Sequence, residues 1–328
     1  MKKAFLFLCD ALFITRPIIF IPVWGYFILG VYRAKVLFAP EALYHITILG
    51  RDFPIMLSFG SAETITGLIM FTLLLGGAYV LNQLTDIEAD KENEGLPLIA
   101  KAGVSTRLAA IETGILLLVP SLYSVYVGGH TCTLFLCSLL LLVAYSAKPF
   151  RFTGRPFLDF LSNALGYGLL AFGLGWLYAL GNEFMGVRTY LKEAAPYFFF
   201  MVAGSINSTI PDMEGDEKAG KTTTAVFMGT RLSNGISTGA IICALAFAFQ
   251  NHDPIAIVTG LVCIPFFFRY LLTNNPKHVM MTFQFCGGFL MALEVLIFPW
   301  FFFFGIMTFA LTRLYFLKRY NITYPKLG

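Results

Sequence analysis

The chain has 328 residues, of which 57% are hydrophobic and only 13% are charged. Soluble domains carry about 25% charged residues, so this composition excludes an ordinary soluble globular fold and indicates a membrane protein. A formal net charge of only +4, spread along the chain, argues against nucleic acid as a partner.

Ten apolar segments are candidates for membrane helices. A bilayer core of about 30 Å requires roughly 20 apolar residues in a helix, and backbone groups in lipid must be hydrogen-bonded within the segment. The predicted spans are 11–33, 62–85, 106–128, 131–146, 157–180, 193–213, 233–249, 254–273, 279–297 and 298–317. The fourth span is short and the last two nearly merge, so we expect an all-α bundle of nine or ten helices in a single membrane domain, residues 1–328.

The distribution of basic residues predicts the orientation of this bundle. With ten spans, most of the 23 Lys and Arg residues fall on the side of the N-terminus. The other side receives Arg33, Lys35, Arg51, Arg188 and Lys192. Cytoplasmic loops are enriched in Lys and Arg, so we expect an integral protein of the cytoplasmic membrane with its N-terminus inside.

Two acidic clusters follow the second and sixth predicted spans. The first cluster reads NQLTDIEAD, which spaces Asn82, Asp86 and Asp90 four residues apart. The second reads PDMEGDEKAGK, with Asp212 and Asp216 at the same spacing, and Asn207 one turn earlier is a candidate substrate ligand. Residues four apart share one face of a helix, and the span count places both clusters on the cytoplasmic side. We therefore expect them to face one cavity.

Clustered carboxylates without His or Cys suit Mg²⁺, which binds through one or two carboxylates together with substrate phosphate. A diphosphate held by Mg²⁺ becomes a good leaving group. Basic residues near the clusters are candidate diphosphate ligands: Lys91, Lys148, Arg151, Lys218 and Lys221. These cations also fit a simpler role as topology determinants, and either acidic cluster alone is typical of a solvated loop. Arg16, inside the first apolar segment, points either to the membrane interface or into the cavity.

These motifs resemble those of the UbiA superfamily of intramembrane prenyltransferases. The first family motif, NDxxDxxxD, corresponds to NQLTDIEAD, and the second corresponds to TIPDMEGDEKAGKTT; the segment YSAKPFRFTGRPFLD between them also matches. The resemblance implies a helix bundle around a central cavity that opens to the bilayer, a polyprenyl diphosphate donor and a membrane-soluble aromatic or lipid acceptor. It also implies that Asn82, Asp86, Asp90, Asp212 and Asp216 bind Mg²⁺ and diphosphate, that Tyr145 lies in a loop over the cavity, and that Lys148 or Arg151 lies near the diphosphate.

The sequence departs from the family pattern at Gln83, Thr153 and Thr209, and an arginine is absent after the first motif. These departures leave the acceptor undefined. Two other functions stay open: a UbiA-type intramembrane terpene cyclase, in which the isoprenoid cation is captured internally, and a transporter with intramembrane acidic residues. A transporter is expected to place its acids near the membrane midplane, whereas these acids lie at helix ends.

Overall fold

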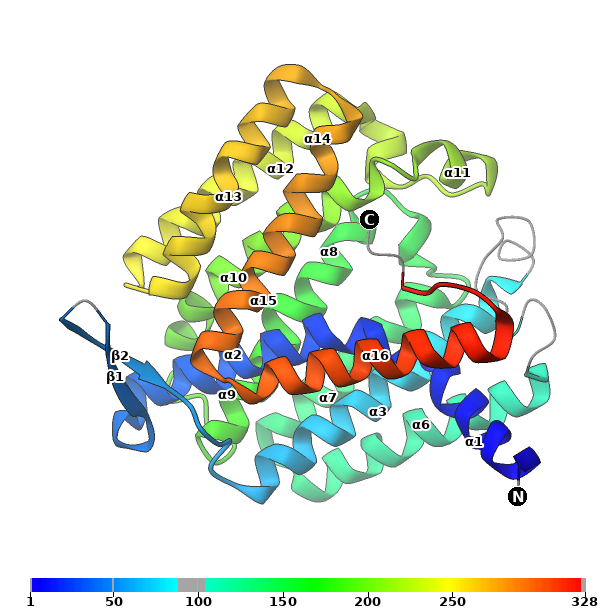
Figure 1. Ribbon diagram of the computed structural model, residues 1–328, viewed down its shortest axis with the longest axis horizontal. Coiled ribbons are helices and arrows are strands. Elements are labelled where there is room, and N and C mark those ends of the chain that lie inside the picture. The colour runs from blue at the N-terminus through cyan, green and yellow to red at the C-terminus, as the bar shows by residue number, and fades with distance from the viewer. Residues whose placement is uncertain (1, 49, 88–98, 100–103, 326–328) are drawn as a thin grey trace.

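Figure 1 shows the computed structural model of the chain, which describes residues 2–48, 50–87, 99 and 104–325. The main elements are α1 (Lys2–Ile14), α2 (Phe20–Phe38), β1 (Tyr44–Ile48), β2 (Arg51–Ile55), α3 (Ala62–Thr85), α6 (Thr106–Val127), α7 (Gly129–Ser146), α8 (Leu158–Ala164), α9 (Phe172–Ala179), α10 (Val187–Thr209), α11 (Met213–Lys218), α12 (Thr224–Gln250), α13 (Pro254–Thr273), α14 (Pro276–Met280), α15 (Cys286–Ile297) and α16 (Trp300–Tyr320). A π-helical stretch, Leu165–Ala171, joins α8 to α9, and another, Met281–Phe285, joins α14 to α15.

Nine helical segments within the described residues are long and apolar enough to cross a membrane. They coincide with nine of the ten predicted spans, which confirms the helical membrane bundle. The remaining span corresponds to α10, which has 23 residues and packs along α12. Arg188, Lys192 and Glu193 make the start of α10 polar, so length and apolarity alone do not identify it.

The first predicted span, 11–33, is broken rather than continuous. The break lies at Arg16, whose φ of 54° is left-handed, and at Pro17, which starts a short 3-10 turn before α2. Proline lacks an N–H and cannot continue the hydrogen-bond ladder of α1. The chain therefore enters the bundle through two helices that meet at an arginine.

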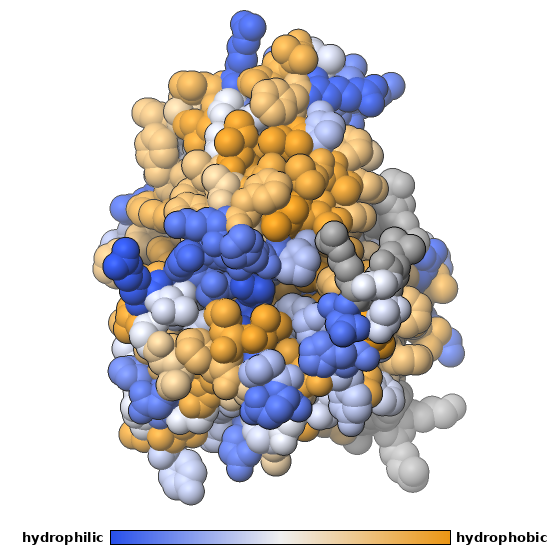
Figure 2. Space-filling view, turned by 90° about the vertical axis from the view of Figure 1, so that its left-hand side faces the viewer, coloured by the Kyte–Doolittle hydropathy of each residue, from blue (hydrophilic) through white to orange (hydrophobic). Residues whose placement is uncertain are grey.

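A β-hairpin follows α2 and was not expected from the sequence. Strand β1 pairs with β2 in antiparallel register, with Tyr44 opposite Ile55 and Ile48 opposite Arg51. The hairpin projects from the end of the bundle opposite α11 (Figure 1). Figure 2 views that end and shows hydrophilic residues gathered across its middle, with hydrophobic residues above and below. The N–H of Met56 donates to the carbonyl of Ile297 at 2.7 Å and anchors the segment after the hairpin to α15.

Helices α2 and α9 pack with their backbones in direct contact. A Cβ atom on Gly30 would overlap the carbonyl oxygen of Phe172, and one on Gly175 would overlap the carbonyl oxygen of Phe27. Small residues allow this close approach between membrane helices. The two helices form one wall of the main core, which also includes the fully buried side chains of Trp176 and Tyr197.

A buried ionic cluster joins three helices near the hairpin end. The Arg33 guanidinium of α2 lies 2.5 Å from the Glu193 carboxylate of α10 and 3.4 Å from Asp253, which precedes α13. Tyr197 donates to Asp253 at 2.7 Å. Arg33 thus lies between two carboxylates, and each charged group of the cluster has a polar partner.

The chain begins and ends on the same side of the bundle, as the even span count predicts (Figure 1). Asp10 of α1 accepts hydrogen bonds from Tyr315 at 2.6 Å and from Arg319 at 3.1 and 3.2 Å. Helix α16 is separate from α15, because residues 298–299 turn the chain, and it runs across α2 to reach α1.

Candidate active site

The first acidic cluster lies at the end of α3. Helix α3 ends at Thr85, and the Asp86 N–H donates to the Asn82 carbonyl at 3.1 Å, so these two residues share the last turn as predicted. The side chain of Asp86 is buried. Gln83, a departure from the family motif, is also buried and donates to the carbonyl of Ile14 at 2.7 Å, so it ties α3 to α1. Asp90 and Lys91 lie outside the described residues.

The second acidic cluster forms a short helix after α10. Asp212 directly precedes α11, and the Asp216 N–H donates to the Asp212 carbonyl at 2.8 Å. The predicted four-residue spacing therefore forms one helical turn. Helix α10 ends at Thr209, two residues before Pro211 and earlier than the predicted span end at 213. Asp212 is exposed and Asp216 is half-buried.

Lys221 brings the two clusters together. Its Nζ lies 3.7 Å from Oδ2 of Asp86, and its charge acts on both Asp212 and Asp216. Its N–H donates to the Asp216 carbonyl at 2.9 Å. Lys221 therefore contacts a carboxylate of the first cluster and acts electrostatically on both carboxylates of the second, which lies more than 120 residues away in the sequence.

The loop after α7 supplies a second cation. Nη2 of Arg151 lies 2.7 Å from Oδ1 of Asp86, whereas Lys221 faces Oδ2 of the same carboxylate. Arg151 has a φ of 40°, in the left-handed region, and non-glycine residues there are uncommon. Lys148 is exposed. Of the two candidates in this loop, the structure brings Arg151 rather than Lys148 to the acids.

Burial and charge oppose each other at the second cluster. Partial burial raises the pKa of Asp212 above its ordinary value, and Lys221 counteracts this rise. The pKa of Asp216 is raised by burial and further by the charge of Asp212, while Lys221 again lowers it. A carboxylate pair with elevated pKa values gains from an added cation, because the cation favours the charged form.

Tyr145 lies in the last turn of α7, not in the loop after it. With Tyr79, Tyr167 and Asn163 it lines a small cavity of about 70 Å³, here called the tyrosine cavity, whose other walls are largely apolar. Its hydroxyl interacts with Thr153 and Asn163. Tyr145 therefore faces the interior just below the acids, at the boundary between the polar site and the apolar bundle.

Arg16 and Lys218, two further predicted residues, have surroundings that differ from each other. Arg16 lies close enough to Tyr79 and Tyr324 to interact with both, which places it toward the tyrosine cavity. Lys218 is exposed and pairs with Glu214 at 2.8 Å, not with the acids of the site.

Asn207 is fully buried and donates to Asn234 at 3.1 Å and to Thr282 at 2.9 Å. This corrects its expected contact with substrate, because its side chain belongs to the packing of α10 against α12. Asn82 remains partly exposed beside Asp86.

Asp159 is a residue of the site that the sequence analysis missed. Its buried carboxylate accepts from the N–H of Thr224 at 2.7 Å and from the Thr224 hydroxyl at 2.5 Å. It thereby joins the start of α8 to the start of α12, and the Thr222 N–H donates to the Gly154 carbonyl at 3.1 Å nearby. These contacts hold the Arg151 loop against the Lys221 segment. Asp159 lies in the first turn of α8, the usual place of a helix-stabilising acid, and that position gave no separate signal of function.

The donor set fits Mg²⁺ that is shared with a substrate. Within the described part of the chain, no three His, Cys, Asp or Glu side chains gather closely enough to hold a metal ion by themselves. Mg²⁺ does not require such a cage, since it is commonly held by one or two carboxylates plus phosphate oxygens. Asp86 on one side and Asp212 with Asp216 on the other supply that minimal set.

Comparisons with known proteins identify the family of this chain. The family model described as the UbiA prenyltransferase family matches residues 56–278. The chain is 30% identical over 192 residues to a probable homogentisate phytyltransferase 2 from Oryza sativa subsp. japonica, a match that covers 55% of this chain and 50% of that protein. It is also 30% identical over 214 residues to digeranylgeranylglyceryl phosphate synthase from Sulfolobus acidocaldarius, covering 62% of this chain and 73% of that one. The chain thus spans about half the length of the Oryza relative.

Solved structures share the fold. A UbiA homologue from Archaeoglobus fulgidus bound to GPP and Mg²⁺ superposes with a TM-score of 0.62 at 18% identity, covering 88% of this chain and 99% of that one. A digeranylgeranylglyceryl phosphate synthase gives a TM-score of 0.65 at 16% identity, covering 94% and 100%. The family model, the paired acidic segments and the shared bundle lead to one conclusion: the chain belongs to the UbiA prenyltransferase family.

Proposed function

We propose that this protein is a Mg²⁺-dependent intramembrane prenyltransferase that moves an isoprenoid chain from a polyprenyl diphosphate to an aromatic or lipid acceptor and releases diphosphate. The observation that carries this proposal is the convergence of Asp86, Asp212 and Asp216 around Lys221, with Arg151 on the far side of Asp86. The acids suit a metal ion and the neighbouring cations suit a polyanion, so the site has ligands for both.

Asn82, Asp86, Asp212 and Asp216 would hold Mg²⁺, and the predicted contribution of Asp90 and Lys91 belongs to the same site. When bound, the metal supplies charge stabilisation for the departing diphosphate. Arg151 and Lys221 are placed to bind diphosphate oxygens, Arg151 as a planar fork and Lys221 as a point charge. Lys148 and Lys218 are too exposed to take part in the same way.

The apolar bundle below the acids would protect the reacting carbon. Tyr145, Tyr79 and Tyr167 line the tyrosine cavity together with aliphatic side chains from α3 and α7. Excluding water keeps an allylic cation from being captured as an alcohol. The ring faces of these tyrosines attract positive charge through their π-electrons, so they would hold the cation until the acceptor attacks.

The test uses purified protein in detergent with C10 to C20 prenyl diphosphates and a panel of aromatic and lipid acceptors, and products are identified by mass spectrometry. We expect Asp86→Asn and Asp216→Asn each to lower Mg²⁺-dependent turnover by about 100-fold or more, since each removes a preorganised charge from the site. Glu214→Gln is the matched control, because Glu214 lies on the same short helix, is exposed, and faces Lys218. Full activity of both aspartate variants would contradict the proposal.

Product analysis and a flux measurement separate the two other functions. A terpene cyclase would release a hydrocarbon from the donor without any acceptor, whereas a transferase requires both substrates. A transporter would move a labelled solute across proteoliposomes without forming a product. The acids of the proposed site lie at helix ends, which does not favour transport.

A further inference from the structure

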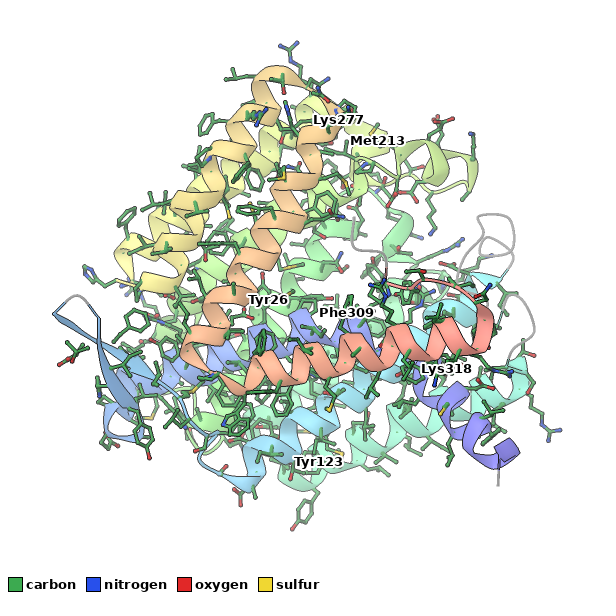
Figure 3. All side chains as sticks on the ribbon, in the orientation of Figure 1. Tyr26, Tyr123, Met213, Lys277, Phe309 and Lys318 are labelled. Atoms are coloured by element: carbon green, nitrogen blue, oxygen red, sulfur yellow. The ribbon has the colours of Figure 1, made fainter. Side chains whose placement is uncertain are left out.

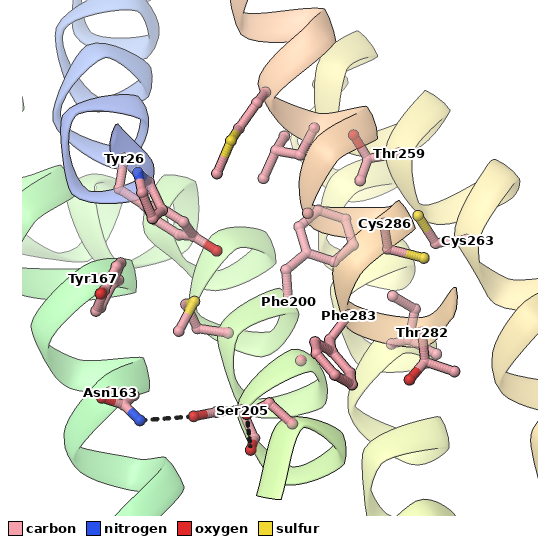
Figure 4. A pocket seen from close by; sticks show the side chains of 18 of the residues that line it. Tyr26, Asn163, Tyr167, Phe200, Ser205, Thr259, Cys263, Thr282, Phe283 and Cys286 are labelled. Atoms are coloured by element: carbon pink, nitrogen blue, oxygen red, sulfur yellow. Dashed lines mark hydrogen bonds between the residues drawn. The ribbon is translucent and has the colours of Figure 1, made fainter. Parts of the chain in front are cut away.

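A second, larger cavity lies beside the tyrosine cavity (Figure 4). It has a volume of about 330 Å³ and is lined by residues of α2, α8, α10, α12, α13 and α15, together with both π-helical stretches. Asn163 and Tyr167 line both cavities and form the wall between them. We call this space the Glu294 cavity after its most unusual residue.

Glu294 of α15 is a carboxyl group inside the membrane bundle. Only 1% of the residue is exposed, and its Oε2 has no hydrogen-bond partner among the described residues. The carboxyl packs directly against the backbone of α2, where a side chain on Gly25 would overlap it. Tyr26, next along α2, lies close enough to Glu294 to interact with it. Figure 4 shows the Tyr26 hydroxyl pointing into the cavity, and Figure 3 shows Tyr26 in the middle of the bundle.

Two other polar side chains of the cavity have hydrogen-bond partners. Asn163 donates to Ser205 at 2.8 Å, as Figure 4 shows, and Thr282 donates to the Val279 carbonyl at 2.6 Å. A buried polar atom without a hydrogen bond costs free energy, and ionisable residues at membrane depth usually have a functional role. Glu294 therefore points to an occupant that supplies the missing hydrogen bond.

The cavity runs along α10 toward the end of that helix that precedes the second acidic cluster. Phe200 and Ser208 of α10 both line it, and at the rise of an α-helix they are about 12 Å apart along the axis. Ser208 is only four residues from Asp212. A molecule in this cavity could thus have its reactive end near the diphosphate site. Both π-helical stretches line it, and such distortions recur at functional sites.

We propose that the Glu294 cavity binds the acceptor, and that Glu294, with Tyr26, hydrogen-bonds to a hydroxyl or N–H group of an otherwise largely apolar acceptor. The term acceptor rests on the proposed prenyl transfer. An isoprenoid chain has no hydrogen-bonding group, so its presence there would leave the carboxyl unsatisfied. A phenol or another hydroxyl-bearing lipid satisfies the carboxyl and fills the apolar walls.

The test measures binding in the absence of turnover, with two probes that differ in a single hydrogen-bond donor. They are 4-octylphenol and its methyl ether, 4-octylanisole, titrated into the purified full chain in detergent while thermal stability is followed. We expect the wild type to bind the phenol about 10-fold more tightly than the ether, the factor expected for one net hydrogen bond. Glu294→Leu should abolish this preference, and Glu294→Gln should retain part of it.

Glu112→Leu is the matched control, because Glu112 is a partly buried glutamate of α6 outside the cavity, and its preference should equal that of the wild type. If Glu294→Leu does not fold, Tyr26→Phe and Glu294→Gln provide the comparison. Equal affinity for the two probes in the wild type, or no binding of either, overturns the proposal, and so does an unchanged preference in Glu294→Leu. Mg²⁺-dependent binding of geranyl diphosphate is measured in parallel; its absence from the wild type would count against prenyl transfer and not against the phenol preference.

Discussion

Lys221 tunes the charge of the second acidic cluster. Burial raises the pKa of Asp212 and of Asp216, and the Lys221 cation opposes both shifts. Removing that cation raises both pKa values further, so the carboxylates would need a higher pH to ionise and bind Mg²⁺. We therefore expect Lys221→Met to move the acidic limb of the pH–rate profile to higher pH, in addition to lowering turnover. Lys218→Met is the control, because Lys218 pairs with exposed Glu214. An unmoved acidic limb in Lys221→Met would show that the cation does not act on these acids.

Residues that belong to a repeated sequence pattern could be assigned to the candidate site from the sequence, whereas isolated residues could not. The repeated four-residue spacing identified Asp86, Asp212 and Asp216, and the structure brings them to the same Lys221. Asp159 and Glu294 were missed because each is a single acid in an apolar segment. Their significance depends on what the fold places opposite them: the N–H of Thr224 for Asp159, and a cavity for Glu294.

At the scale of elements, the contact of α2 with α9 gives a test of packing. Gly30→Ala would place a methyl group on the carbonyl oxygen of Phe172, which forces the helices apart. We expect a loss of several °C in the melting temperature of the detergent-solubilised protein, because overpacking a tight interface costs about 1–3 kcal/mol. Gly114→Ala in α6 is the control, since a Cβ there meets no atom within 4 Å and alanine favours the helix. A Gly30→Ala protein as stable as Gly114→Ala would contradict this picture.

Helix positions were predictable because twenty-residue apolar segments have few alternatives in a bilayer. The spans 62–85 and 254–273 agree with α3 and α13 at both ends. The hairpin at 44–55 was missed because strands of five residues carry a weak periodic signal. The π-helical stretches have no sequence signature; they depend on the packing of neighbouring helices.

At the scale of the whole molecule, the charge bias predicts which end faces the cytoplasm. We expect a cysteine at Glu217, on α11, to react with a membrane-impermeant maleimide only after cells are opened, and a cysteine at Tyr44, on the exposed hairpin, to react in intact cells. The background protein needs its six cysteines replaced, because Cys137 and Cys243 are exposed on the bundle. The reverse labelling pattern would show that the protein has the opposite orientation in the membrane.

The two cations beside Asp86 affect the order in which the prenyl donor and the metal would bind. Arg151 and Lys221 occupy opposite oxygens of this one carboxylate, so two cations of the chain itself balance its charge. A diphosphate is a stronger competitor for both cations than a single carboxylate, because it offers more charge and more oxygens. Under the proposed function, the arriving donor draws the two cations toward itself and uncovers Asp86. Under the same proposal, Asp86 would become free to bind the metal only when the molecule to be cleaved is present.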